Sequence, residues 1–247
     1  MRRRVRTVGG VATGVCPVCG QTETMNIEDV LPQWVRRHAT SVAPGAAFTG
    51  TLASGAPFNA PVPFKITVRM GQPCNTWMGE RFEAPVKPVL LPLLDGVAQR
   101  LTWVDQELIG RWVTKTALMN ALAHPPHPDL AVYQAFRRSG NPPPGSRVLL
   151  GIYSSPGVLP KTRQGFRYAG PGTAPPGTLE FLPFNAILGQ LVIVFCLPMQ
   201  GPPVRTVAEA ESALIEIWPP TRLPITWPPS IGLDAAGVEA ASLWELA

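Results

Sequence analysis

Three short stretches decide the fold of this chain: Cys16-Pro17-Val18-Cys19-Gly20, then Glu28-Asp29-Val30-Leu31-Pro32-Gln33-Trp34, and then Cys74-Asn75-Thr76-Trp77-Met78. A Cys-x-x-Cys-Gly turn presents two thiolates on one side, where a single tetrahedral metal ion can bind both. Cys74 adds a third thiolate from further along the chain. We therefore expect Cys16, Cys19 and Cys74 to converge on a metal ion, with Zn²⁺ as the structural cofactor.

Together these stretches resemble the zinc-supported HNH, or ββα-metal, endonucleases. The matching bacterial branch reads Cys-x-x-Cys-Gly, Glu-His-x-x-Pro-x-Trp, Cys-x-x-Cys-Asn and Trp-Met. The resemblance covers residues 14–90 and departs from the pattern at two positions: Asp29 stands in place of the family's histidine, and Gly71 in place of a cysteine. It implies an N-terminal HNH-like module in which a strand, a knuckle and a helix follow one another.

The resemblance also implies a catalytic site at Glu28, Asp29 and Asn75, which hydrolyses a phosphodiester with Mg²⁺ or Mn²⁺. Glu28 matches the acidic residue that helps to hold the cation, and Asn75 matches the asparagine after the last cysteine. The family's histidine is the general base, a role that suits imidazole because its pKa lies near neutral pH. A carboxylate, with a reference pKa of about 3.9, is a weaker base.

Two interpretations of Asp29 follow. Either the site is catalytically decayed, or Glu28 and Asp29 hold a cation while another group supplies the base. His38 is nine residues further on, some 13 Å along a helix at a rise of about 1.5 Å per residue, which argues against it as the replacement. His124 and His127 fall in a proline-rich turn, and Glu83 is a candidate for an additional cation ligand.

The zinc site has an open question as well. Structural zinc is almost always held by four ligands, and three cysteines are at hand. The fourth ligand is water or a distant residue, because Cys196 lies in an apolar, strand-like run that favours burial. The alternative is a knuckle without metal, held together by packing.

Composition and charge favour a soluble protein that contacts nucleic acid, with DNA as the favoured partner. The chain has 247 residues, 45% of them hydrophobic, and a net charge of +5. Residues 1–100 hold 11 Lys and Arg against 6 Asp and Glu, whereas residues 101–247 hold 10 against 10. The excess positive charge thus lies with the HNH-like motif, where it suits a phosphate backbone.

The sequence shows no pattern of a secreted or membrane protein, so we expect a cytoplasmic protein with no membrane partner. Four cysteines, three of them at knuckle positions, do not form a secreted disulfide framework. The basic Met1–Arg4 start lacks the apolar core of a signal peptide. The longest apolar run, 186–199, is too short to cross a bilayer.

The pattern of elements predicts an α+β fold with two domains: an HNH-like zinc-knuckle module over 1–98 and a helix-plus-antiparallel-strand domain over 99–247. We expect helices over 27–38, with Asn26 as N-cap, over 76–94, interrupted by Pro85, Pro88 and Pro92, and over 105–123 and 129–138. We expect strands over 64–70, 147–153, 178–184 and 186–197. Lys115 lies on the apolar stripe of the 105–123 helix.

Two classes of function fit these observations. The first is an HNH-family metal-dependent endonuclease, or a catalytically weakened descendant that binds nucleic acid. The second is a non-enzymatic zinc-knuckle scaffold that binds nucleic acid or a protein partner, as a subunit of a phage- or defence-related assembly. In the second case two Trp-Pro-Pro motifs, at 218–220 and 227–229, are candidates for a docking segment.

Overall fold

The structure is a computed structural model that describes residues 6–8, 11–42, 48–51, 57–60, 66–123, 128–154, 162–163, 181–198, 204–206, 212–241 and 244–246. Its helices are α1 (Gln33–Val42), α2 (Gln72–Met78), α3 (Ala84–Leu94), α4 (Trp103–Ala123), α5 (Leu130–Ser139) and α7 (Ala235–Ala241), with a π-helical turn η1 (Gly79–Glu83). Its strands are β1 (Arg6–Val8), β2 (Val11–Val15), β3 (Thr22–Asp29), β4 (Phe48–Thr51), β5 (Pro57–Ala60), β6 (Thr67–Gly71), β7 (Gln99–Leu101), β8 (Arg147–Ile152), β9 (Thr162–Arg163), β10 (Phe181–Leu188), β11 (Leu191–Pro198), β12 (Val204–Thr206), β13 (Ile215–Trp218), β14 (Ile225–Trp227) and β15 (Trp244–Leu246). Helices and mostly antiparallel sheets confirm the predicted α+β class.

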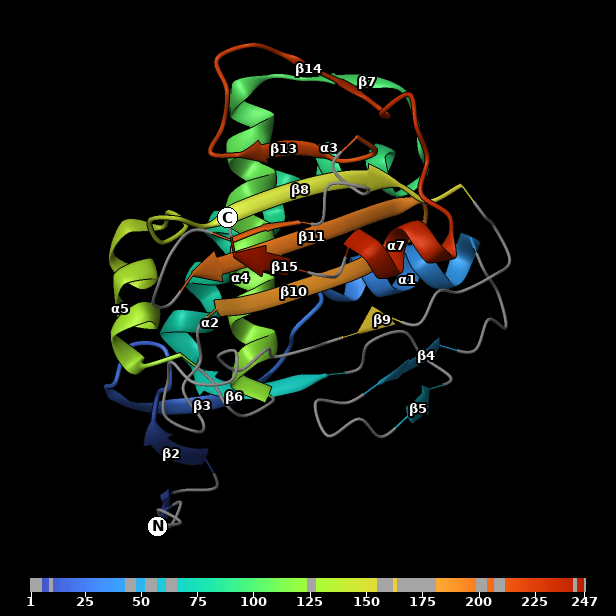
Figure 1. Cartoon of the computed structure of the whole chain (residues 1–247). Coiled ribbons are helices and arrows are strands. Elements are labelled where there is room, and N and C mark those ends of the chain that lie inside the picture. Colours follow the sequence, from blue (N-terminus) through green and yellow to red (C-terminus); the bar gives the residue numbers. More distant parts are fainter. Residues whose placement is uncertain are drawn as a thin grey trace.

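The centre of the molecule is a four-stranded antiparallel sheet in the order β10-β11-β8-β13, with the long helix α4 on one face and α7 on the other (Figure 1). Successive side chains of a strand point to opposite faces. Ile193 and Phe195 accordingly pack in the same cluster as Trp112 of α4, whereas Val192 and Val194 pack in the cluster that includes α7. The central strand β11 is therefore apolar along nearly its whole length.

A second four-stranded antiparallel sheet, in the order β1-β2-β3-β6, lies near one end of α4 (Figure 1). Strand β3 pairs antiparallel with β6, in a register that sets Met25 opposite Gly71 and Asp29 opposite Thr67. The chain then passes directly from Gly71 into α2, where proline occupies the first turn. Proline is well tolerated there because the N–H that it lacks has no partner within the helix. The pairing of β3 with β6 thus brings two separate stretches of sequence, residues 22–29 and 67–78, together.

The predicted helix over 27–38 is wrong in its first half. Residues up to Asp29 belong to β3, and helix α1 begins only at Gln33. The backbone of residues 25–29 pairs with that of β6. Just beyond the strand, the amide of Val30 donates a hydrogen bond to the carbonyl of Ile66 at 2.9 Å. Pro32 also disfavours a helical conformation for the residue before it. Glu28 and Asp29 therefore lie on a strand, which changes the directions of their side chains.

The prolines after α2 do not break the helical run as predicted. Helices α2 and α3 are joined without a gap by η1, in which the amide of Ala84 donates to the carbonyl of Gly79, five residues earlier. Pro85 stands at the start of α3, and Pro88 and Pro92 lie inside it. The wider hydrogen-bond spacing of a π-helical turn carries the chain from one helix into the next.

The predicted strands of the C-terminal half are present in the part of the chain that the structure describes, with a shifted division; residues 178–180 of the predicted strand 178–184 lie outside it. The break between β10 and β11 falls at Gly189 and Gln190 rather than at residue 185. Gly189 has a φ of +60°, and a Cβ there would lie 2.3 Å from the carbonyl oxygen of Leu94. A glycine is thus required by both the turn and the close approach of α3.

A single cluster of buried side chains extends across the predicted domain boundary at residue 98. It includes Cys16 and Met70 from the first part of the chain and Trp112, Phe195 and Trp227 from the second. Strand β7, which immediately follows the predicted boundary, pairs with β14 near the C-terminus. The two-domain division stays a prediction, but the core is shared between the two parts.

The Trp-Pro-Pro motifs belong to this core. The side chain of Trp227 is 1% exposed. The ring of Trp218 packs against Gly110 of α4, where an added Cβ would lie 2.7 Å from it. Both rings therefore pack within the core of the chain itself. Among the helices that the structure describes, none has the length and hydrophobicity needed to span a bilayer.

Candidate metal centre and adjoining carboxylate cluster

The first part of the candidate metal centre is the turn between β2 and β3. Its backbone closes through the amide of Gly20, which donates to the carbonyl of Cys16 at 2.9 Å, and through the amide of Cys16, which donates to Gln21 at 2.8 Å. Gly20 has a φ of +79°, a conformation that favours glycine. The amide of Val18 donates to Sγ of Cys16 at 3.4 Å. The turn therefore holds Cys16 and Cys19 with their sulfurs toward the same side.

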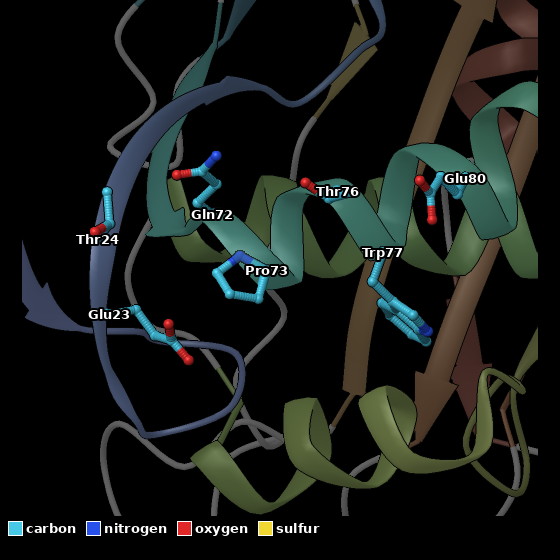
Figure 2. Close-up of a pocket in the computed structure, with 7 residues that line it drawn as sticks. All are labelled: Glu23, Thr24, Gln72, Pro73, Thr76, Trp77 and Glu80. Atoms are coloured by element: carbon cyan, nitrogen blue, oxygen red, sulfur yellow. The ribbon is translucent and has the colours of Figure 1, made fainter.

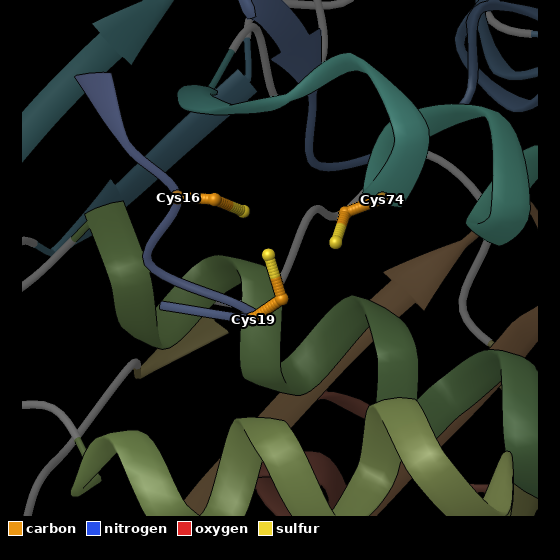
Figure 3. Close-up of side chains that lie close together, drawn as sticks. All are labelled: Cys16, Cys19 and Cys74. Atoms are coloured by element: carbon orange, nitrogen blue, oxygen red, sulfur yellow. The ribbon is translucent and has the colours of Figure 1, made fainter. Parts of the chain in front are cut away.

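Cys74 comes from the first turn of α2 and completes the cluster (Figure 3). The Sγ atoms of Cys16, Cys19 and Cys74 all lie within 4.8 Å of one another, and none of them is in a disulfide. Cys16 and Cys74 are buried, and Cys19 is half-buried. The predicted convergence of the three cysteines is confirmed, and they lie close enough to hold one metal ion.

The electrostatics of the thiols fit a cation at this point. Burial raises the pKa of Cys16, but hydrogen bonds from the amides of Cys19, Gly71 and Val18 outweigh it, so the pKa is lowered overall. Burial, and then the charge of Cys16, raise the pKa of Cys74 to about 12. A second or third thiolate in this space is costly without a positive charge between the sulfurs. Thiolate ligands suit zinc and other soft metal ions, so the donor set fits Zn²⁺.

Gly71 lies immediately beside the cluster. A Cβ at this position would be 3.2 Å from Cβ of Cys16, but only 2.8 Å from Cβ and 2.9 Å from Cγ of Glu23. The stem of Glu23 thus fills the space that a side chain at position 71 needs. Among the described residues, no histidine, cysteine or carboxylate joins the three cysteines as a fourth ligand at that range.

Helix α5 covers the knuckle from the other side. Nε2 of Gln134 donates to the carbonyl of Cys19 at 3.1 Å. Arg137 hydrogen-bonds to Cys74 and lies over the ring of Trp77, with its guanidinium carbon 4.2 Å from the ring centroid. Trp77 in turn contacts Phe82 edge to face, at 4.9 Å between centroids. The cysteine cluster is therefore anchored to α5 as well as to α2.

The second feature is a set of polar groups where β3 ends. Glu28 accepts a hydrogen bond from the side chain of Asn75, which follows Cys74 on α2. Burial raises the pKa of Glu28, while the nearby ammonium of Lys115 and the hydrogen bond from Asn75 act against that rise. Two of the three predicted catalytic residues, Glu28 and Asn75, are therefore in contact, and Asn75 directly follows Cys74 of the cysteine cluster.

The side chain of Asp29 points away from that of Glu28. Consecutive residues of a strand face opposite sides, so Asp29 cannot share the direction of Glu28 as it would in the first turn of a helix. Its carboxylate forms an ion pair with Arg36 of α1. His38 hydrogen-bonds to Oδ1 of Asp95 at 2.8 Å. His124 and His127 lie outside the described residues.

The sequence did not identify Lys115 of α4 as a site residue, although it is the ion-pair partner of Glu83. Its side chain is fully buried, with Nζ 2.5 Å from Oε1 of Glu83 and 3.3 Å from the carbonyl oxygen of Val30. The signal was present in the sequence, because a lysine on an otherwise apolar helix face must find an oppositely charged partner in the interior. Glu83, expected as a cation ligand, is bound to that lysine.

A pocket of about 510 Å³ lies between α2 and strand β3 (Figure 2). Its lining includes the carboxylates of Glu23 and Glu80 and the ring of Trp77, together with Thr24, Gln72, Pro73 and Thr76. The lining contains two acidic residues and no basic one. This composition does not attract a phosphate group.

No protein-family model matches the chain, and comparisons with curated proteins and with solved structures find no match.

Proposed function

We propose that this chain is a nucleic-acid-binding protein built on an HNH-like zinc-knuckle module, descended from a metal-dependent endonuclease and catalytically weakened. The observation that carries the proposal is the order β3–β6–α2, which combines the Cys16, Cys19 and Cys74 cluster with the contact between Glu28 and Asn75. The cysteines would hold a structural Zn²⁺ that fixes the start of α2. DNA is the favoured partner.

The weakened activity follows from the position of the general base. Hydrolysis of a phosphodiester needs a group that takes a proton from water in the transition state. At the corresponding position this chain has Asp29, whose carboxylate is paired with Arg36. The guanidinium occupies this carboxylate, so it is not free to position a water molecule beside a phosphodiester. Glu28 and Asn75 retain the arrangement that a cation ligand and its support would need.

The contact with DNA is supported by charge. Residues 1–100 carry the whole net charge of +5, and Arg69 of strand β6 is exposed. Neutralising phosphates releases counterions, so binding through such a surface weakens steeply as salt increases. The proposal therefore includes a salt-dependent interaction without strong sequence preference.

The test is binding of the full-length, zinc-loaded chain to duplex DNA over a series of salt concentrations. We expect affinity to fall linearly with salt on a double logarithmic scale. Arg69→Glu should weaken binding and reduce the slope by about one. Arg138→Glu is the matched control, since it makes the same change at an exposed position on α5. Absence of binding at low salt, or equal effects of the two variants, would contradict the proposal.

A non-enzymatic scaffold for a protein partner is the second candidate. It is favoured by the two internal ion pairs, Asp29 with Arg36 and Glu83 with Lys115, which leave the acidic groups of the cluster paired within the chain. Absence of DNA binding together with stoichiometric zinc in the purified protein would favour this candidate over the first.

A further inference from the structure

Lys115 occupies an unusual place for a lysine. It lies in the middle of α4 with a side chain that is 0% exposed, between neighbours that are also buried. A buried ammonium group is costly unless charged and polar partners surround it. Here those partners come from other elements: the carboxylate of Glu83 in η1 and the carbonyl oxygen of Val30 after β3.

Glu28 is the third oxygen-bearing group around the ammonium. Lys115 is near enough to act on the charge of Glu28, and Glu83 acts on Glu28 as well. The carboxylate of Glu83 and the carbonyl of Val30 thus contact the ammonium directly, and the carboxylate of Glu28, which accepts a hydrogen bond from Asn75, lies near enough to interact with both charges. Oxygen ligands of these kinds are the ones that Mg²⁺ and Mn²⁺ prefer.

The ammonium cannot readily leave this position. Its side chain is fully buried, in a stretch of α4, residues 112–121, in which every residue is buried. Withdrawing the charge would leave Glu28 and Glu83 close together without a cation, and like charges at short range repel strongly in a medium of low dielectric constant. A divalent ion approaching the same point would instead be repelled by the ammonium.

We propose that Lys115 is a built-in cation, which takes the place of a divalent metal ion between Glu28 and Glu83 and closes this cluster to Mg²⁺ and Mn²⁺. The inference rests on the proposed function, since it assigns a cation site to the weakened nuclease module. It also gives Lys115 a structural role, because its one charge joins β3, η1 and α4.

The test compares Mn²⁺ binding to the zinc-loaded chain and to its variants, by equilibrium dialysis and electron paramagnetic resonance. Loading with zinc first keeps Mn²⁺ away from the thiolates. The native chain should bind no Mn²⁺ at this cluster. Lys115→Met, which removes the charge and keeps most of the volume, should bind one Mn²⁺ per chain. The double variant Lys115→Met/Glu83→Gln is the matched control and should lose that ion.

Thermal unfolding gives a second measurement. Lys115→Met should have a lower Tm than the native chain and should recover about 5–10 °C at a hundredfold excess of Mn²⁺ over its Kd. The native chain and the double variant should not respond. If Lys115→Met does not fold, the native chain still decides the matter: one bound Mn²⁺ that Glu83→Gln abolishes would overturn the inference.

These results are independent of DNA binding. Absence of DNA binding would overturn the proposed function and leave the Mn²⁺ comparison unchanged. Mn²⁺ binding by the native chain at Glu28 and Glu83 would overturn the role of Lys115 and leave the zinc-knuckle module and its DNA contact in place. A Lys115→Met variant that folds without binding Mn²⁺ would also contradict the inference.

Discussion

Asp29, the last residue of β3, is ion-paired with Arg36 of α1. The pair joins the strand to the helix that follows it, and it turns the carboxylate of Asp29 away from the neighbouring Glu28. A second pair, between Glu83 and Lys115, lies behind Glu28. Asp29 and Glu83, the acidic residues nearest Glu28, are therefore each paired with a cation of the chain itself, and the proposed loss of nuclease activity rests on these two pairs.

Activity should return only when both obstacles are removed. Asp29→His supplies a base with a pKa near neutral pH, and Lys115→Met opens the cluster to a metal ion. We expect each single variant to show little cleavage, and the double variant to exceed both by roughly 10² to 10⁴, the usual contribution of a positioned general base. Plasmid nicking with Mn²⁺ measures this. A folded double variant that binds Mn²⁺ and DNA but does not cleave would contradict descent from a nuclease.

Zinc should stabilise the fold through Cys74. Cys74→Ala removes one of three thiolates, so we expect the zinc content of the purified chain to fall from one per chain to near zero. The zinc-dependent rise in Tm should disappear with it. Cys196→Ala is the control, because Cys196 is a buried cysteine of β11 remote from the cluster. Equal zinc contents in the two variants, measured by elemental analysis, would exclude the cysteine cluster as the site.

The metal-free chain should lose stability at high pH because of Cys74. Its folded-state pKa, about 12, lies above the reference value of 9.0. The contribution is fully present below pH 9.0, where the thiol is protonated in both states, and is lost as the pH rises toward about 12. Chemical denaturation over this range should show a smaller loss for Cys74→Ala. Identical pH profiles for the two chains would contradict the burial of this thiol.

Much of the cysteine cluster could be predicted from sequence because its geometry is local. A Cys-x-x-Cys-Gly turn closes on itself, and the position of Cys74 at a helix start follows from the proline before it. The strand over 22–29 could not be recognised in the same way. Asn26, Glu28 and Asp29 imitate a helix start, whereas the strand is stabilised by pairing with β6, a partner distant in sequence.

The carboxylate cluster depends still more on tertiary structure. Whether Glu28 and Asp29 face the same side is decided by helix or strand geometry, and the contact with Asn75 requires the strand. The partner of Lys115 comes from η1, whose π-helical turn has no clear sequence signature. The apolar pattern of α4 predicted the helix itself. The lysine on its apolar face, Lys115, was the residue that indicated an acidic partner in the interior.

Gly71→Cys should not restore a fourth ligand without a second change. A Cβ at position 71 would lie 2.8 Å from Cβ of Glu23, so we expect the single variant to lose about 1–3 kcal/mol, as overpacked sites do. Glu23→Gly in the same chain removes the obstructing stem. The double variant should recover stability relative to Gly71→Cys and bind zinc more tightly than the native chain. Competition with a chromophoric chelator measures the affinity, and tighter binding by the single variant alone would contradict the steric argument.

A plasmid-nicking assay of the native chain tests the proposed loss of nuclease activity most directly. The zinc-loaded, full-length protein is incubated with plasmid in low salt, with Mg²⁺ or Mn²⁺, and the same samples are run in a mobility-shift gel. We predict a shifted plasmid that stays supercoiled, because Asp29 is held by Arg36 and the cation position by Lys115. Metal-dependent conversion to the nicked form, abolished by Asp29→Ala, would contradict this result and make Asp29 a working catalytic carboxylate.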